Sequence, residues 1–507
     1  MRRAALLLAL AAIACGSTPE DEGEATSIAA VGQGDVARMR VEVEVLSGAR
    51  SESCAVSGLS SPGCRVLRSA DERTFSRYAG SDSSQERLTR ATGYVCERFG
   101  AALGVPCDVD RASGPRVVLQ RFRSNDREQA NILAIIPGTA PERPVTVVGA
   151  HHDSTTTESG PAPGAMDNAS GVAILLELAR AFATAPPAGT VILAAFAAEE
   201  GQTHATGSDG SRHYVATLTG GGCERSGAGA MPCASRVGAM LNLDMLALPR
   251  LRRVGARLEP FPGGVPAGDH VRLFAKPGTE ACVAAAAGDS VHQALGRALT
   301  VAARESGAGL AVRAGQTSDR VTNGFARFSD HFSFHEAGIP AVRLIGPQAV
   351  DDAGLNHSAF DRTSRPVGAY EASMADADQI LDWDYLARAS RLVMTFTRSL
   401  ASGLTGPRPR VDGAVVSWDA VPGATGYMVA LRKPRTDPNE HTVAPGDVLR
   451  VTTPQVTVPP GYRTVAVAAI DAGGLVGRLS REVLLGGVCT DLAPPACASP
   501  FTADCDD

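Results

Sequence analysis

The chain has 507 residues, which is too long for one ordinary domain and predicts about three domain-sized units, although one could still be a single large α/β domain. Its 44% hydrophobic and 20% charged residues are ordinary for a globular protein. A formal net charge of −6 and the lack of a basic cluster in the sequence give no electrostatic reason to expect nucleic acid as a partner.

The first residues predict a bacterial export signal. Arg2 and Arg3 precede an apolar run, 4–14, that is too short to span a bilayer as a mature helix. The run ends in AAIACGS, which resembles a lipobox with Cys15 as the lipidated residue, although leucine is commoner at the position of Ala12. Simple secretion and a chance cysteine are the alternatives.

The N-terminal region therefore divides into a signal peptide over 1–15 and a flexible, acidic tether over 16–35. We expect an exported protein, either a cell-envelope lipoprotein attached to the membrane through Cys15 or a secreted one.

The remaining cysteines fit an oxidising compartment, in which disulfides form. Three neighbouring pairs would each close a loop of about ten residues: Cys54 with Cys64, Cys96 with Cys107, and Cys223 with Cys233. The connectivity of four others stays open: Cys282, Cys489, Cys497 and Cys505. None of the cysteines has CxxC spacing or a histidine partner, which disfavours a metal held by cysteines.

Strand and helix patterns alternate through the middle of the chain. After a helical and loop-rich start, with a helix expected over 83–104, short β-rich runs occur at 116–122, 130–138 and 144–153. A helix at 169–183 and buried strands follow, at 189–200, 237–247 and 339–346. Strand 144–153 is apolar at nearly every position, as a strand covered on both faces would be. The alternation predicts an α/β layer sandwich.

After Gly403 the sequence contains short strands and proline-glycine turns but no helical pattern, which predicts a small β-sandwich over 404–487. The stretches VSWDAVPGATGYMV and VAVAAIDAGGLVGRLS resemble a fibronectin type III module. We expect a spacer or surface-attachment unit, whose partner the sequence does not identify. Residues 488–507 form a cysteine-bearing tail.

Acidic and histidine residues follow three of the buried strands, at the strand ends where α/β sheets place their ligands. These residues are His151 and Asp153, Glu199 and Glu200, and Asp244. Each cluster alone is more often a turn, a solvated strand end or a helix cap. Together, converging carboxylates would repel one another unless a cation lies between them, and mixed His/Asp/Glu ligation is typical of zinc.

The region 145–363 resembles the co-catalytic zinc aminopeptidases of metallopeptidase family twenty-eight, which include bacterial leucyl aminopeptidases and aminopeptidase Y. The matching stretches occur in the family's order: VVGAHHDS, PGAMDNASGVAILLELAR, AAFAAEE, GSRHYV, LNLDML, SDHFSFHEAGIPAV and LNHSAFDRTS. The resemblance implies a zinc exopeptidase fold over 36–403, a three-layer α/β sandwich with a mixed, mostly parallel central sheet.

The resemblance also implies two zinc ions per chain. His151 and Asp244 would be terminal ligands of one ion, Glu200 and His357 would complete the other, and Asp167 would bridge both. Two ions about 3.5–4 Å apart require such a bridge and a free acid that handles the proton of the bridging water.

Glu199 would be that acid, the general base. Asp153 would accept a hydrogen bond from the second ring nitrogen of His151 and fix its tautomer, and Asp330 is a weaker candidate for a supporting role. The sequence departs from the family pattern at His152, expected to point away from the metals, and at Met166, where an acid is common.

We therefore expect a dizinc metallopeptidase, most simply an aminopeptidase acting on peptides or proteins with a free N-terminus. A carboxypeptidase, a glutaminyl cyclase with a single zinc ion and a non-catalytic peptidase-like binding protein are the alternatives. The sequence contains no HExxH zinc helix and no G-x-S-x-G serine motif.

Overall fold

The computed structural model describes residues 35–48, 76–80, 82–109, 113–156, 161–200, 208–221, 223, 232–276, 290–314, 328–347, 349–363, 380–434 and 443–485. The predicted signal peptide, Cys15, the tether up to residue 34, the Cys54–Cys64 pair, Cys282 and the cysteine-bearing tail lie outside these residues. Among the helices that are described, none is long and apolar enough to cross a membrane.

A mixed sheet of eight strands forms the centre of the α/β domain. Its strands, in spatial order, are β1 (Arg116–Ser124), β2 (Arg127–Ile136), β4 (Val191–Phe196), β3 (Val145–His151), β5 (Val237–Leu243), β10 (Ala341–Ile345), β8 (His270–Phe274) and β9 (Ala311–Ala314). The central strands β4, β3, β5 and β10 are parallel to one another, whereas β1, β2 and β8 contribute antiparallel pairings. The predicted mixed, mostly parallel sheet is confirmed.

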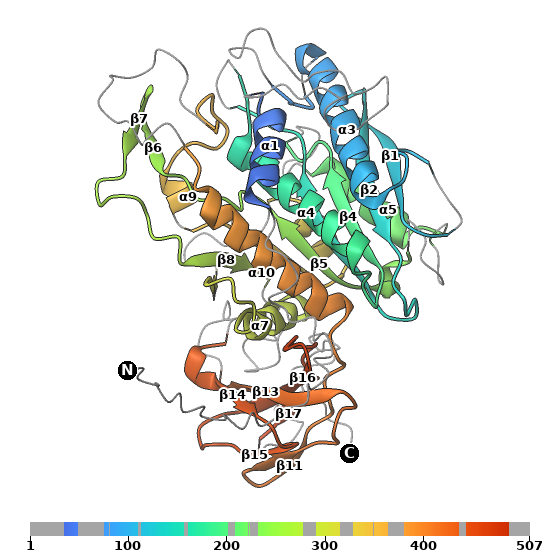
Figure 1. The fold of residues 1–507 in the computed structure, drawn as a ribbon, viewed down its shortest axis with the longest axis vertical. Coiled ribbons are helices and arrows are strands. Elements are labelled where there is room, and N and C mark those ends of the chain that lie inside the picture. Colours follow the sequence, from blue (N-terminus) through green and yellow to red (C-terminus); the bar gives the residue numbers. More distant parts are fainter. Residues whose placement is uncertain are drawn as a thin grey trace, which may run out of the picture.

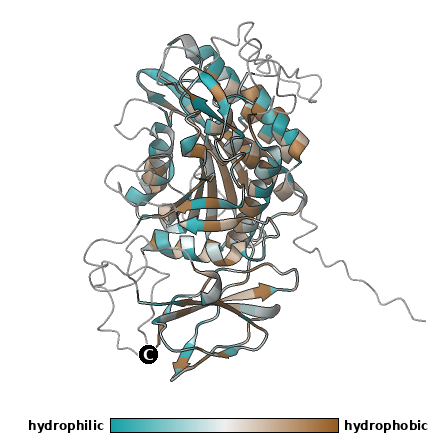
Figure 2. Ribbon diagram, turned by 90° about the vertical axis from the view of Figure 1, so that its left-hand side faces the viewer, coloured by the Kyte–Doolittle hydropathy of each residue, from teal (hydrophilic) through white to brown (hydrophobic). Residues whose placement is uncertain are grey.

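Helices cover both faces of this sheet. Val148 and Ala150 of β3 belong to the larger core, on the side of α1 (Val36–Leu46), α3 (Asp82–Leu103), α4 (Ser170–Thr184) and α10 (Trp383–Ala401). Val145 and Val147 face the smaller core, which includes α5 (Asp209–Thr219) and α8 (His331–Glu336). Because alternate residues of β3 face opposite cores, the strand is buried along its whole length. Figure 2 shows these hydrophobic strands in the middle of the domain.

Further short elements complete the α/β domain. They are the hairpin β6 (Leu251–Val254) and β7 (Arg257–Pro260), the helices α7 (Val291–Ala303) and α9 (Ala349–Asp352), and the turns η3 (Ala165–Ala169) and η4 (Ala234–Arg236). With helices on both sides of the sheet, the predicted three-layer sandwich is confirmed.

The C-terminal region forms two small antiparallel sheets, as predicted. One contains β11 (Arg410–Asp412), β12 (Val415–Ser417) and β15 (Gln455–Thr457); the other contains β14 (Val448–Val451), β13 (Ala424–Arg432), β16 (Thr464–Asp471) and β17 (Val483–Leu484), with the turn η5 (Pro445–Asp447) before β14. They enclose a core in which the rings of Trp418 and Tyr427 pack edge to face, with 5.2 Å between the ring centroids. The fibronectin type III assignment stays a prediction.

The β-sandwich is packed against the α/β domain and is not a free appendage. Met428 and Ala468, on the outer face of its four-stranded sheet, belong to the same buried core as residues of α7 and α10. Nε of Arg478 donates to the carbonyl of Leu400 at 2.8 Å. Figure 1 shows the sandwich beside α7, at the end of α10. We conclude that the two parts share one hydrophobic core.

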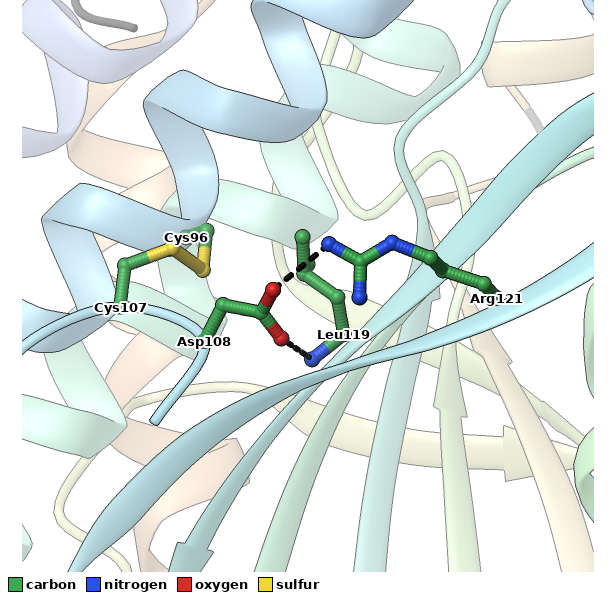
Figure 3. Close-up of a disulfide and its surroundings, with 5 residues drawn as sticks. All are labelled: Cys96, Cys107, Asp108, Leu119 and Arg121. Atoms are coloured by element: carbon green, nitrogen blue, oxygen red, sulfur yellow. Dashed lines mark hydrogen bonds and ion pairs between the residues drawn. A yellow bond between two sulfur atoms is a disulfide. The ribbon is translucent and has the colours of Figure 1, made fainter. Parts of the chain in front are cut away.

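Two of the predicted disulfides are present, Cys96–Cys107 and Cys223–Cys233. The first ties the chain after α3 back to that helix, beside β1, which is one of the two outermost strands of the central sheet (Figure 3). There the carboxylate of Asp108 accepts hydrogen bonds from the backbone N–H of Leu119 at 3.0 Å and from the guanidinium of Arg121 at 2.6 Å. The disulfide and Asp108 therefore cover part of the edge of this sheet.

Candidate metal centre

The predicted ligands converge because three neighbouring parallel strands end at one edge of the sheet. His151 is the last residue of β3, Glu199 and Glu200 follow β4, and Asp244 follows β5. Nε2 of His151 lies 3.5 Å from Oδ1 of Asp244, and both side chains are buried. The geometry of the sheet thus assembles one half of the site.

Asp167 lies in η3, immediately before α4, and joins the two halves. Its Oδ1 lies 3.1 Å from Nε2 of His151, and its Oδ2 lies 3.3 Å from Nε2 of His357. The carboxylate of Asp361 accepts the backbone N–H groups of Met166 at 2.6 Å and of Asp167 at 3.0 Å. Asp361 therefore fixes the turn that presents Asp167.

His357 comes from the loop after α9 and is about one-third exposed, unlike the other four predicted ligands. Its Nε2 lies 3.1 Å from Oε1 of Glu200. Ligand atoms of His151, Asp167 and Asp244 lie within 4.8 Å of one another, and so do those of Asp167, Glu200 and His357. These two groups share Asp167 and consist of predicted ligands, whereas a third possible group combines His151 with Glu199 and Glu200.

Asp153 supports both halves of the site. Its two oxygens accept the backbone N–H groups of Glu199 and Glu200, each at 3.1 Å. Its Oδ1 also lies 3.5 Å from Nδ1 of His151, which is longer than the hydrogen bond expected from the sequence. Asp153 therefore orients the two glutamates, a role that sequence reasoning missed.

Asp244 is held from the neighbouring strand β10. Nη2 of Arg343 lies 3.0 Å from Oδ2 of Asp244, which leaves Oδ1 directed toward His151. Burial raises the pKa of Asp244, but the charge of Arg343 and the contact with His151 lower it further, so that its pKa is below the usual range. Asp244 is thus kept ionised, as a metal ligand must be.

Asp167 is also kept ionised, because His151 and His357 lower its pKa against the effect of burial, but three other carboxyl groups resist ionisation. Burial raises the pKa of Glu200 to about 7, with the charge of Asp167 adding to the shift. Burial also raises the pKa of Glu199 well above its usual range, against the attraction of His151. The pKa of Asp361 rises to about 7 through burial and the nearby Asp167. A divalent cation among these carboxylates would relieve both the desolvation and the repulsion.

The residues fit zinc by their chemistry. Nδ1 of His151 is buried and has no hydrogen-bond partner among the described residues, while Oε1 of Glu200 contacts only a histidine that would itself be a ligand, His357, in the ion pair described above. Burial opposes a charge on His357, but Asp167 and Glu200 raise its pKa to about 12. Metal binding would take the place of that proton, because a histidine ligand must be neutral. Imidazole and carboxylate together form the mixed donor set that zinc accepts.

The two remaining candidates, His152 and Asp330, contribute no ligand to these groups. His152 points away from the ligands, as predicted: its Nδ1 contacts the carbonyl of Phe196 at 2.7 Å and its Nε2 contacts Oγ1 of Thr92 at 3.0 Å. Asp330 is fully buried at the start of α8, and burial raises its pKa to about 7 while His151 opposes the shift. It lies near the site but contributes no ligand to the groups above.

Sequence reasoning missed Asp361, Arg343 and Arg77. Asp361 lies within the matching stretch LNHSAFDRTS, so its position was visible although no role was assigned. Arg343 is a single arginine in an otherwise apolar strand, a pattern that indicates a buried partner. Arg77 has no such pattern around it.

Comparison with known proteins identifies relatives of the α/β domain. The sequence model of Peptidase family M28 matches residues 131–397. A probable zinc metalloprotease of Pyrenophora tritici-repentis is 28% identical over 324 residues, covering 60% of this chain and 66% of that protein. A second, from Pyricularia oryzae, is 29% identical over 348 residues, covering 63% of this chain and 61% of the relative. The chain thus spans less than two thirds of the length of each.

Among solved structures, the LapA aminopeptidase of Legionella pneumophila is similar at 17% identity and a TM-score of 0.45, with 78% of this chain and 79% of that chain covered. The glutaminyl cyclase of Tannerella forsythia is similar at 17% identity and a TM-score of 0.42, with coverages of 72% and 99%.

Proposed function

Since the chain belongs to Peptidase family M28, we propose that it is an aminopeptidase that releases N-terminal residues with two zinc ions at this site. The observation that carries the dizinc proposal is the position of Asp167. One of its oxygens faces His151 and the other faces His357, so a single carboxylate serves two ligand groups. A site for one ion would not need the second group.

Two zinc ions bound there would polarise the scissile carbonyl and lower the pKa of a water molecule. Glu199 is partly buried beside this position and belongs to neither ligand group around Asp167, although it could form a third group with His151 and Glu200. It would take a proton from the attacking water and pass it to the leaving amine. Asp153, which binds the backbone N–H of Glu199, would hold the base in place.

The preference for a free N-terminus is supported by the sequence stretches shared with the zinc aminopeptidases. A carboxypeptidase would cleave peptides whose N-terminus is blocked. A glutaminyl cyclase would release ammonia from N-terminal glutamine without hydrolysing a peptide bond. Amino acid p-nitroanilides, N-blocked peptides and glutaminyl peptides therefore separate the three activities, and metal analysis separates one zinc ion from two.

The test of the base is Glu199→Gln. We expect the variant to keep two zinc ions per chain and to lose about 10²- to 10⁴-fold in kcat, the usual contribution of a general base. Glu177→Gln is the matched control, because Glu177 is a glutamate that pairs with Arg38 and Arg180 away from the ligands. Full activity in Glu199→Gln would exclude Glu199 as the base.

We also propose that the protein is exported. The two disulfides support this proposal, because such bonds are rare in reducing compartments. Attachment through a lipidated Cys15 is the form that the N-terminal sequence favours. Metabolic labelling with a fatty acid, compared between the wild type and Cys15→Ser, distinguishes the lipoprotein from a secreted form.

A further inference from the structure

Arg77 lies beneath the metal site and outside the region matched by the family, 131–397. It is the largest fully buried side chain among the described residues. Its Nε donates to the carbonyl of His152 at 2.9 Å, its Nη1 to that of Pro163 at 2.5 Å, and its Nη2 to that of Gly164 at 3.2 Å. Nη1 also donates to the carbonyl of Leu46. The guanidinium therefore joins three separate segments of backbone.

Two of these segments carry metal ligands. The carbonyl of His152 follows directly after His151, and those of Pro163 and Gly164 lie just before the turn that presents Asp167. Arg77 thus spans the gap between the segments of one terminal ligand and of the bridging ligand. Because a guanidinium is planar, it fixes the direction as well as the distance of the carbonyls that it binds.

The backbone around Arg77 strengthens this connection. Its N–H donates to Oγ of Ser154 at 3.2 Å, and that hydroxyl donates to the carbonyl of Ala162 at 2.6 Å. Ser76 forms an isolated parallel β-bridge with Ala162. Segment 76–77 is therefore bonded on one side to the end of β3 and on the other side to the segment before η3.

The turn before Asp167 is tightly packed against the side chain of Arg77. Gly164 has a φ of 59°, and a Cβ there would come within 2.4 Å of the carbonyl oxygen of Asp167 and 2.9 Å of Nη2 of Arg77. The backbone of the turn consequently packs directly on the guanidinium. A substitution of Arg77 would therefore displace the turn that carries the carboxylate of Asp167.

Arg77 is also a fixed positive charge among acids. Burial lowers its pKa to about 10, against the attraction of Asp153, Asp361 and Asp167, so it remains charged at neutral pH. In the absence of metal this cation offsets part of the repulsion among the carboxylates that must converge.

We propose that Arg77 is a positioning residue that holds the segment of Asp167 against the end of β3, so that the dizinc site is formed before metal binds. The inference rests on the proposed function, because it concerns the same two zinc ions. It differs from a general structural role, since it predicts an effect on zinc affinity beyond any effect on stability.

The test compares zinc affinities of metal-free proteins by competition with a chromophoric chelator. We expect Arg77→Met to lose about 10- to 100-fold in zinc affinity, the range found when groups that orient metal ligands are removed. Arg77→Lys should lose affinity to a similar degree, because an ammonium cannot reach all four carbonyls. Wild-type affinity for both ions in Arg77→Met would overturn the proposal, and so would full recovery of affinity in Arg77→Lys.

Arg98→Met is the matched control. Arg98 is a mostly buried arginine whose Nη2 lies 2.5 Å from Oε1 of Glu42, in the layer of α1 and α3. We expect this variant to lose stability but to keep wild-type zinc affinity. An equal loss of affinity in Arg98→Met would reduce the effect of Arg77 to general destabilisation and overturn the proposal.

Ser154→Ala provides the test if Arg77→Met does not fold. It removes only the hydroxyl that links Arg77 to Ala162, so a smaller loss of zinc affinity is expected in a folded protein. Unchanged affinity in that variant would contradict the proposal. A wild-type chain that binds fewer than two zinc ions would instead refute the proposed function itself.

Discussion

Replacing Arg343 by methionine should destabilise the zinc-free protein much more than the zinc-loaded protein. Nη2 of Arg343 lies 3.0 Å from Oδ2 of Asp244, and each side chain is only 4% exposed. Removing one partner of a buried ion pair costs about 3–5 kcal/mol, because the other charge stays buried without a partner. In the loaded protein zinc would supply another positive partner for Asp244, so we expect a loss of about 1–2 kcal/mol there.

The two losses in the free energy of unfolding differ by about 2–3 kcal/mol. Zinc should therefore stabilise the variant by that much more than it stabilises the wild type. The assay is urea unfolding followed by far-UV circular dichroism, with the chelated protein and with zinc in excess. Arg432→Met is the matched control, since Nη2 of Arg432 lies 2.7 Å from Oε2 of Glu482 in the β-sandwich and both side chains are buried. It should lose the same free energy of unfolding with and without zinc. Equal losses for Arg343→Met in the two states would refute the assignment of Asp244 as a ligand.

Two further predictions concern the structure around the site. Ala468→Asp places a charge in the core shared by the β-sandwich and α10, and should cost about 3–5 kcal/mol in the free energy of unfolding, whereas Val415→Asp, at a position 42% exposed, should cost little. Similar melting temperatures for the two variants would show that the β-sandwich does not share a core with the α/β domain. Burial lowers the pKa of His335 to about 3, so between pH 6.5 and 4 the unfolded chain binds a proton that the folded one does not. Stability therefore falls with decreasing pH, and His335→Gln should reduce that slope by about 1.4 kcal/mol per pH unit; parallel stability curves would contradict this prediction.

The strands of the sheet and the residues at their ends could be predicted from the sequence because both follow local patterns. A strand buried on both faces is continuously apolar, and a polar group directly after it lies at the edge of the sheet. This reasoning found His151, the glutamate pair and Asp244. Asp167 and His357 lie on loops whose positions depend on distant contacts, and only the resemblance to a family could assign them.

The supporting residues could not be predicted for the same reason. Arg77 binds backbone carbonyls that are 31 to 87 residues away in the sequence, and a backbone carbonyl can belong to any residue type, so the sequence does not reveal the partner. The packing of the β-sandwich against the α/β domain, in contrast, is visible in the sequence. The strands β13 and β16 contain the continuous apolar runs YMVAL and VAVAAI, as expected when both faces of a sheet are covered, and they are buried almost throughout. A free β-sandwich would have alternated between apolar and polar residues.

The covered edge of the central sheet has a consequence for handling the protein. An exposed edge strand offers unpaired N–H and C=O groups to strands of other molecules, which is a common route to aggregation. In β1 the N–H of Leu119 is already bound by Asp108, and the Cys96–Cys107 disulfide keeps that carboxylate in place. Protein produced in a reducing cytosol would lack this bond and would expose the edge during folding. Production with export to an oxidising compartment should therefore give more soluble material than cytosolic expression of the same chain.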